Sequence, residues 1–163
     1  MNLKQQIDQD LISALKSKDE LKSSVLRMVK SSIKNKEIAL RQAPSKILGT
    51  SQGGTPNELD DPTIIDVLSK EIKQRKDSIE QYQSGNRPEL AEKEKKEIDI
   101  ILEYLPEQMS EDKITKIIKD AITKSGASNM ADMGKVMGII MPEFKGKADG
   151  TLVSKIVKEK LSK

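Results

Sequence analysis

Few side chains in this sequence could catalyse a reaction, because it contains neither histidine nor cysteine. Histidine is the commonest general base and metal ligand, and cysteine supplies thiolate nucleophiles, disulfides and many zinc sites. Catalysis would therefore depend on Lys, Asp, Glu, Ser or Tyr. Asp99 and Glu103 lie one helical turn apart and could share a Mg²⁺ ion through oxygen ligands. Such pairs are common on exposed helices, so we predict no catalytic residue, no metal site and no cofactor.

A better-supported chemistry is the binding of phosphate groups by lysines that stand beside glycines. Near the C-terminus the sequence reads ADMGKVMG over 131–138 and KGKADG over 145–150. Lysine side chains and the N–H groups of a helix N-terminus both bind phosphate, although Asp149 would partly oppose an anion. The candidate residues for contact with an RNA backbone are Gly134, Lys135, Gly138, Lys145, Gly146 and Lys147.

Gly134 and Gly138 lie in a segment with helical periodicity, where an interior glycine costs about 1 kcal/mol relative to alanine. The inner face of this helix is expected to carry Met130, Met133, Met137 and Met141, bordered by Val136 and Ile140. The glycines and Lys135 then fall on the opposite face. Either a neighbouring helix of the same domain packs closely there, or a partner such as a nucleic-acid backbone approaches.

A second basic surface is expected on the segment 20–42. Its outer face carries Arg27, Lys30, Lys34 and Arg41. A basic helical stripe can follow a row of phosphates, which makes Arg27, Lys30 and Lys34 further RNA-binding candidates. The same composition is typical of a solvated helix face. Glu37 also interrupts the stripe, and no aromatic residue is placed for stacking on bases.

Three charged residues occupy positions where the helical pattern expects an apolar side chain. They are Lys36, Lys76 and Glu94. Because an unpaired buried charge is costly, we predict that Glu94 forms a structural ion pair with one or both lysines. A catalytic pair of a lysine and a carboxylate is the alternative interpretation.

The elements that would hold these residues are helices. Only 2% of the residues are aromatic and 34% are charged, whereas sheets favour aromatic and β-branched residues. We predict an all-α protein with an N-terminal bundle of about four helices over 1–106 and a compact three-helix domain over 107–163. The segment 43–62 is rich in Gly, Pro, Ser and Thr and is predicted to be a mobile surface loop. The expected helices cover roughly 2–17, 20–42, 62–84, 88–105, 111–125, 129–141 and 150–162.

Several residues are predicted to start or stop these helices. Ser17 and Glu20 have the spacing of a capping box, and Asp61 followed by Pro62 is typical of a helix start. Later helices are expected to be capped by Ser110, Ser128 and Asp149 and ended by Gly126 and Pro142.

Net charge and hydropathy indicate where the protein acts. The formal net charge is +3. From Glu107 onward there are 11 Lys and 8 Asp+Glu, a balance of +3, so the whole surplus lies in the C-terminal third. No apolar run has the length of a signal peptide or a membrane span. We expect a soluble cytoplasmic protein without membrane partners, which leaves open an organellar address removed by processing.

Several segments together resemble the GatB/YqeY family. ADMGKVMG (131–138) followed by KGKADGTLV (145–153) is similar to its C-terminal signature. LRMVKSSIKNKEI (26–38), KEIKQRKDSIEQY (70–82) and EKKEIDIILEYLPEQMS (94–110) resemble its N-terminal half. The last third also resembles the tail domain of the B subunit of tRNA-dependent amidotransferases, which is understood to engage tRNA.

The resemblance implies a tRNA-binding or tRNA-amidotransferase-accessory protein without its own catalytic centre. The positions most similar to the B-subunit tail are Val136, Met137 and 146–148, so any inherited tRNA contact should lie nearby, whereas Gly134 and Lys135 match the stand-alone members better. In our preferred hypothesis Lys135, Lys145 and Lys147 contact the RNA. The kinase-like body of the B subunit is absent from this sequence, as is the Gly/Ser-rich motif of the amidase partner. Two alternatives stay open. One is a carbon–nitrogen ligase with glutamine as amide donor, and the other is a helical adaptor whose glycine face binds an amidotransferase or another protein.

Overall fold

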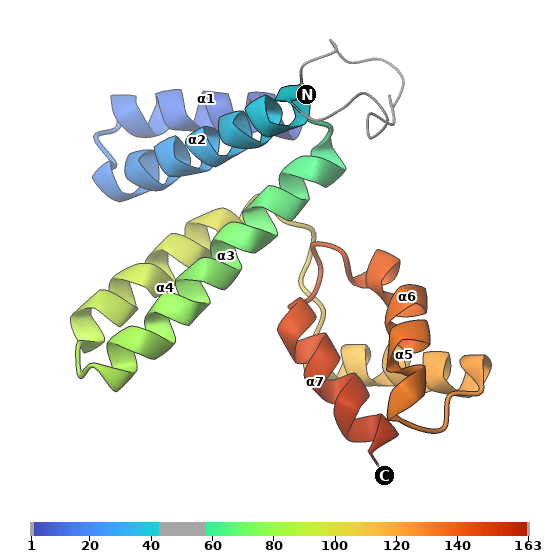
Figure 1. The fold of residues 1–163 in the computed structure, drawn as a ribbon. Helices are drawn as coiled ribbons and strands as arrows, with labels where there is room; N and C mark the ends of the chain where they lie inside the picture. Colours follow the sequence, from blue (N-terminus) through green and yellow to red (C-terminus); the bar gives the residue numbers. More distant parts are fainter. Residues whose placement is uncertain (1, 43–57, 163) are drawn as a thin grey trace. The chain divides into compact units, whose positions relative to one another are not determined.

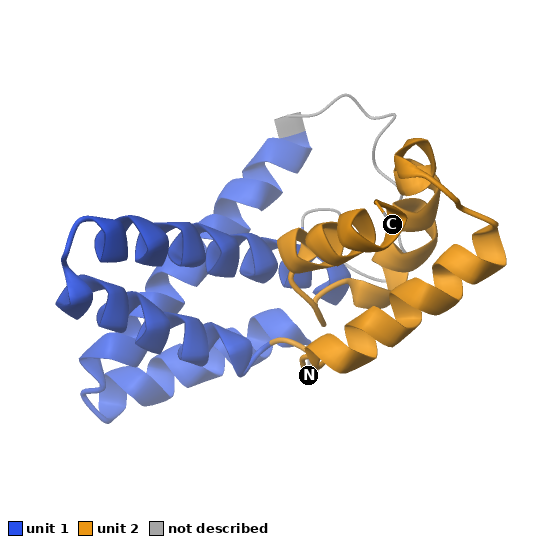
Figure 2. Cartoon of the chain, turned by 90° about the horizontal axis from the view of Figure 1, so that it is seen from below, with its two compact units in different colours: residues 1–104 blue, residues 105–163 orange. Residues whose placement is uncertain are grey.

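The structure is a computed structural model that describes residues 2–42 and 58–162. Within these residues all regular secondary structure is helical, so the predicted all-α class is confirmed. The chain divides into two compact units, residues 1–104 and 105–163 (Figure 2). That each unit folds as an independent domain stays a prediction. Most of the predicted loop, residues 43–57, lies outside the described residues.

Unit 1 contains two pairs of neighbouring helices (Figure 1). In the first pair, α1 spans Leu3–Lys16 and α2 spans Glu20–Gln42. In the second pair, α3 spans Asp61–Ser84 and α4 spans Pro88–Leu102. Each helix of unit 1 contributes one aliphatic stripe to the core, and α2 contacts both α3 and α4. α1 also contacts α3, so both helices of the first pair hold the second pair.

The end of unit 1 is fixed to its beginning by Tyr104. This side chain is buried, and its hydroxyl donates a hydrogen bond to Asp10 Oδ2 over 2.7 Å. Burial and the neighbouring Asp10 carboxylate both raise the pKa of Tyr104. The phenol consequently keeps its proton and serves as the donor that ties the segment after α4 to α1.

Unit 2 is a three-helix arrangement with one short 3-10 helix. α5 spans Glu111–Ser125, the 3-10 helix η2 spans Met130–Asp132, α6 spans Met133–Phe144 and α7 spans Gly150–Leu161. Its core consists of Ile114, Ile118, Ala121, Val136, Ile140, Phe144, Val153, Ile156, Val157 and Leu161. The segment before α5 is attached to the turn before α7, because Met109 N–H donates to the Lys147 carbonyl over 2.8 Å.

Three predicted caps in unit 2 are confirmed. The Ser110 side chain accepts from Lys113 N–H, and the Asp149 side chain accepts from Thr151 N–H over 2.8 Å. Gly126 ends α5 with φ 67°, a left-handed conformation that costs other residues about 1 kcal/mol or more. These signals are local, so they could be predicted from sequence.

Two predicted caps in unit 1 are wrong. Asp60 caps α3, because its Oδ1 accepts from Thr63 N–H over 3.1 Å, whereas Asp61 Oδ1 accepts from Leu3 N–H at the start of α1 over 2.9 Å. Ser17 ends α1 and makes no capping box. Asp19 caps α2 instead, since its Oδ1 lies 3.0 Å from Lys22 N. A cap must stand directly before the first helical turn.

The predicted boundaries of the glycine-containing helix are also wrong. Asn129, and not Ser128, provides the first cap, because its Oδ1 accepts from Ala131 N–H over 2.8 Å. Pro142 lies inside α6, which continues to Phe144. The proline is exposed and close to the helix end, where water can replace the backbone hydrogen bond that it removes.

The buried face of α6 differs from the predicted methionine stripe. Val136, Ile140 and Phe144 are the buried side chains, at a spacing of four. Met133 and Met137 border them, but Met130 is 39% exposed and Met141 is 40% exposed. The predicted buried face is rotated about the helix axis relative to the observed one. The prediction ended the helix before Phe144 and included Met130, which precedes α6.

Candidate functional site

The outer face of α6 is open. This disagrees with the interpretation in which a neighbouring helix packs against the glycines. Gly134 and Gly138 are exposed, and a Cβ built on either would meet no described atom within 4 Å. No described helix of unit 2 packs closely against this face. The interpretation of the glycines as a close internal helix contact is therefore wrong within the described residues. We call this surface, formed by Gly134, Gly138 and the exposed side chain of Lys135, the glycine face.

The glycine face also presents an unusual backbone group. In an α-helix the carbonyl of Gly138 would accept a hydrogen bond from the N–H of residue 142. Residue 142 is proline, which has no N–H. The Gly138 carbonyl thus lacks its α-helical donor, and the Pro142 ring stands where that donor would be.

Lys135 does not stand freely on the glycine face. Its Nζ donates to the carbonyl of Ser125 over 3.1 Å, at the last residue of α5. The C-terminus of a helix carries partial negative charge, which favours a cation there. An ammonium group has three donors, so this contact leaves two N–H groups of the exposed Lys135 for a further partner.

The other predicted basic residues lie at the far end of α6. Lys145 is exposed, Lys147 is half-buried, and Gly146 between them has φ 71°. The Gly146 carbonyl accepts from Gln108 Nε2 over 2.7 Å, which holds this turn in place. Ten residues of helix separate Lys135 from Lys145, about 15 Å along the axis. The lysines therefore bracket the glycine face and do not form one cluster.

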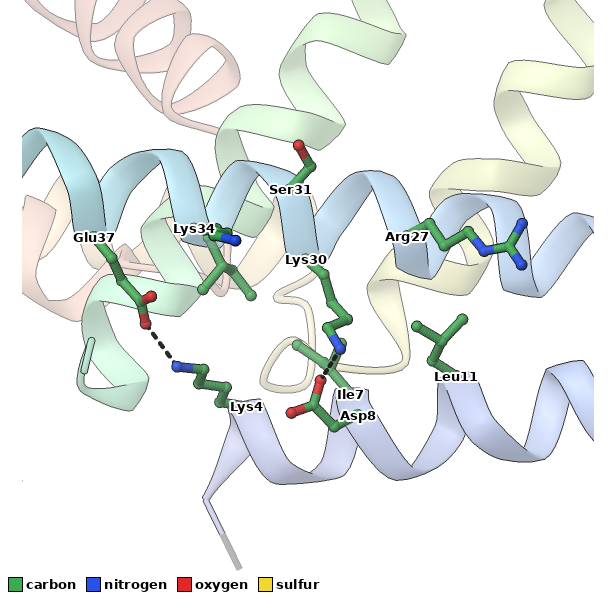
Figure 3. A pocket seen from close by; sticks show the side chains of 10 residues that line it. Lys4, Ile7, Asp8, Leu11, Arg27, Lys30, Ser31, Lys34 and Glu37 are labelled. Carbon is green, nitrogen blue, oxygen red and sulfur yellow. Dashed lines mark hydrogen bonds and ion pairs between the residues drawn. The ribbon is translucent and has the colours of Figure 1, made fainter. Parts of the chain in front are cut away.

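Arg27, Lys30 and Lys34 belong to unit 1, where they line a groove between α1 and α2 (Figure 3). The groove has a volume of about 550 Å³. We call it the α1–α2 groove; its lining residues are Lys4, Ile7, Asp8, Leu11, Arg27, Lys30, Ser31, Ile33, Lys34 and Glu37. All three basic side chains are exposed, as the predicted outer face requires, and they stand beside the seam between α1 and α2.

Two ion pairs cross the α1–α2 groove. Lys30 Nζ lies 2.7 Å from Asp8 Oδ1, and Lys4 Nζ donates to Glu37 Oε1 over 2.7 Å (Figure 3). The hydrogen bond with Glu37 raises the pKa of Lys4, although burial opposes the shift. Glu37 interrupts the basic stripe of α2 in the sequence. In the structure it is the partner that neutralises Lys4 and connects α2 to α1.

The buried charges of unit 1 are not the predicted ones. Arg75 is the buried cation: its Nη1 lies 2.7 Å from Glu71 Oε2, and its Nε lies 3.2 Å from Glu97 Oε2. Lys36 and Lys76 are exposed and Glu94 is half-buried. The expected burial of the two lysines is wrong. On α3 the buried stripe runs through Ile64, Leu68, Ile72 and Arg75, which turns Lys76 outward; on α2 the long Lys36 chain can reach water.

Glu94 lies near this buried network. Burial, and then the charge of Glu97, raise the pKa of Glu94, while Arg75 and Lys93 oppose the shift. A carboxyl whose folded pKa exceeds its unfolded value is deprotonated less readily in the folded state, so it destabilises the fold increasingly as pH rises through that interval. At neutral pH the charged Glu94 therefore weakens unit 1.

We predict that Glu94→Gln raises the urea midpoint at pH 7. The difference from the parent should shrink as pH falls and vanish below the ordinary glutamate pKa of 4.5, where Glu94 is neutral in both folded and unfolded states. The measurement is urea unfolding followed by circular dichroism between pH 4 and pH 7. Glu92→Gln, at an exposed position of the same helix, is the control. A stabilisation that does not change with pH would contradict the assignment.

The described residues contain no group of three acidic residues placed to hold a metal ion. A pair such as Asp99 and Glu103 is too small for this criterion, so the expectation that it binds no metal stays a prediction. Across residues 2–42 and 58–162, no helix is long and apolar enough to cross a membrane. A cytoplasmic location stays a prediction.

Comparison with known proteins identifies relatives of the chain. In Saccharomyces cerevisiae strain YJM789, the protein named "Altered inheritance of mitochondria protein 41, mitochondrial" is 34% identical over 136 residues, covering 80% of this chain and 66% of the relative. The protein of that name in Lachancea thermotolerans is 37% identical over 125 residues, covering 76% and 59%. The chain thus spans about two thirds or less of the length of these relatives, which their name places in mitochondria.

A family model also matches the chain. It is described as "Yqey-like protein" and covers residues 4–161, which includes the α1–α2 groove, the Arg75 network and the glycine face. The match extends through both units, as the sequence resemblance predicted. The chain therefore belongs to the YqeY-like, or GatB/YqeY, family.

Proposed function

We propose that this protein binds transfer RNA through unit 2, as a tRNA-binding or tRNA-amidotransferase-accessory protein without a catalytic centre of its own. The observation that carries the proposal is the open glycine face of α6, where neither Gly134 nor Gly138 has a described neighbour within 4 Å of its Cβ position. An interior helical glycine costs about 1 kcal/mol relative to alanine. Close approach of a partner's backbone gives a physical reason for that cost.

The charge around the glycine face supports a polyanionic partner. Lys135 stands at one end of α6 and Lys145 at the other, with Lys147 in the following turn. Their separation of about 15 Å along the helix is enough to reach more than one phosphate of a nucleic-acid strand. Contacts of this kind position a nucleic acid without reading its sequence, so the proposal concerns affinity and not the choice of tRNA.

A sequence resemblance supports tRNA as the polyanion. Val136, Met137 and the segment 146–148 are the positions most similar to the B-subunit tail of tRNA-dependent amidotransferases, which is understood to engage tRNA. Gly134 and Lys135 match the stand-alone members of the family better.

The test is the binding of a fluorescein-labelled tRNA transcript to the full chain, followed by anisotropy across a salt series. We expect affinity to fall steeply with salt, because each neutralised phosphate releases counterions. Combined replacement of Lys135, Lys145 and Lys147 by alanine should weaken binding about tenfold at physiological salt and reduce the salt slope by about two to three units.

The matched control removes the same charge from unit 1. Lys93, Lys95 and Lys96 are exposed on α4, and their combined replacement by alanine should leave tRNA affinity close to that of the parent. Circular dichroism and thermal melting must show that both triple variants are folded. An equal loss of tRNA affinity in the two variants would show that binding is general charge attraction. Full affinity in the variant that lacks Lys135, Lys145 and Lys147 would contradict the proposed site.

A further inference from the structure

We infer that the α1–α2 groove of unit 1 binds an acidic amphipathic α-helix of a partner protein. The groove lies in the other unit from the glycine face, so this inference is independent of the proposed RNA contact. Three features of the groove argue for such a helix: an exposed aliphatic strip along α1, a pair of cations on α2 that form no ion pair with a described residue, and the distance between those cations.

The aliphatic strip continues the groove along α1. Leu11 and Asp8 line the groove, and Leu15 falls between them in helical projection. Ile12 lies next to Asp8 on the same side, so these four side chains occupy an arc of about 100°. Ile12 is 53% exposed and Leu15 is 46% exposed. The core of unit 1 leaves both uncovered, and an aliphatic partner surface would remove them from water.

The cations available to a ligand are Arg27 and Lys34. Lys30 is neutralised by Asp8, and Lys4 is neutralised by Glu37. Arg27 and Lys34 are exposed and form no ion pair with any residue that the structure describes. After the internal pairs are counted, the groove keeps two positive charges beside an aliphatic strip. Its complement is a partner with carboxylates on one flank and aliphatic side chains on the other.

The spacing of the cations fits a helix. Arg27 and Lys34 are seven residues apart on α2, which is about 10 Å along the axis. Two carboxylates seven residues apart on a partner helix have the same separation and lie on one face. Aliphatic residues that continue the partner helix past Arg27, towards the turn between α1 and α2, would then meet Leu11, Ile12 and Leu15, as in other helix-in-groove complexes. The groove volume of about 550 Å³ accommodates several such side chains.

Nucleic acid fits this groove less well than it fits the glycine face. Phosphates placed against Ile12 and Leu15 would lose water without gaining a polar partner. The chain has only Tyr82, Tyr104 and Phe144 as aromatic residues. None of the three lines the groove, so bases would find no stacking surface there.

The experiment uses the full chain and a fluorescein-labelled 18-residue helical peptide of Ala, Leu and Glu, in which two glutamates seven residues apart are followed by a leucine stripe on the same side. We expect saturable binding in the micromolar range by anisotropy. The double substitution Arg27→Glu and Lys34→Glu should weaken binding at least tenfold. A peptide that carries lysine in place of the two glutamates should bind this variant better than it binds the parent, because charge complementarity is restored.

The aliphatic strip is tested separately. Ile12→Ala and Leu15→Ala should each weaken peptide binding several-fold, and both positions are exposed enough for the fold to persist. Met28→Ala is the matched control, since Met28 is 41% exposed on the other flank of α2. Peptide binding that none of these variants changes, or no saturable binding to the parent, would overturn the inference.

Two further outcomes would assign the groove to another occupant. Loss of tRNA affinity in the Arg27→Glu, Lys34→Glu variant would make the groove an RNA contact. Self-association of the parent in sedimentation experiments, lost in Leu15→Glu, would make it an interface between two copies of the chain. Neither outcome affects the Lys135, Lys145 and Lys147 test, so failure of this inference is distinguishable from failure of the proposed RNA function.

Discussion

Replacement of Arg75 by alanine should lower the free energy of unfolding by about 3–5 kcal/mol, the usual cost of removing one partner from a buried ion pair. The Arg75 side chain is only 7% exposed and contacts the carboxylates of Glu71 and Glu97 at 2.7 and 3.2 Å. Without the guanidinium, these two carboxylates repel each other with little access to water. The measurement is the urea or thermal unfolding of the full chain.

The structure offers a matched control on the same helix. Lys73 is exposed on α3, and Lys73→Ala should change the unfolding free energy by less than about 0.5 kcal/mol. Arg75→Met combined with Glu97→Gln should recover part of the loss, because it removes one of the unpaired charges and fills the space with an apolar chain. An Arg75→Ala variant as stable as the parent would show that water reaches the network freely.

The Arg75 network also connects three helices of unit 1. Glu71 Oε1 accepts from the Ser32 hydroxyl of α2 over 2.7 Å, while Arg75 bridges from α3 to Glu97 of α4. These polar contacts are directional, whereas aliphatic packing tolerates rotation and sliding of helices. The network therefore specifies how α2, α3 and α4 align. Through α2 it also positions one wall of the α1–α2 groove.

The sequence predicted the helices well and the buried charges poorly, for physical reasons. Helix existence depends on local periodicity and on caps such as Ser110, Gly126 and Asp149, whose partners lie within a few residues. A buried charge depends on a neighbour from another helix. Arg75 and Lys76 are adjacent cations, and the carboxylate that pairs with the buried one, Glu97, lies on α4. A stricter helical phase through Ile64, Leu68 and Ile72 would have favoured Arg75.

The candidate sites show the same division. That Gly134 and Gly138 share a face follows from their spacing of four, but only the structure could show that no described helix covers that face. The α1–α2 groove was not predicted at all. Arg27, Lys30 and Lys34 were recognised as a basic group, whereas their position beside Asp8 and Leu11 depends on how α1 lies against α2. The signal that could have been used is Ile12, which the helical pattern of α1 places away from Ile7 and Leu11; the exposure of Leu15, on their face, is seen only in the structure.

From the open glycine face we predict that one substitution, Gly138→Leu, both stabilises the fold and abolishes most of the tRNA binding. Gly138→Leu should raise the unfolding free energy by about 0.5–1 kcal/mol, because leucine is the better helix former and a Cβ meets open space there. The same side chain would hold a polyanion away from the backbone of α6 and so weaken several contacts at once. We expect tRNA affinity to fall more than thirtyfold, about 2 kcal/mol. Thermal unfolding and fluorescence anisotropy measure the two effects on one preparation.

Gly138→Ala separates helix propensity from bulk. It should stabilise the fold by about 1 kcal/mol while reducing tRNA affinity much less than leucine does, because a methyl group adds little thickness to the face. Thr123→Leu places equal bulk at an exposed position of α5 and should leave tRNA affinity unchanged. If Gly138→Leu binds tRNA as the parent does, the glycine face is not the contact surface. If Gly138→Leu instead destabilises the fold, another part of the chain covers the face, and the glycines serve internal packing after all.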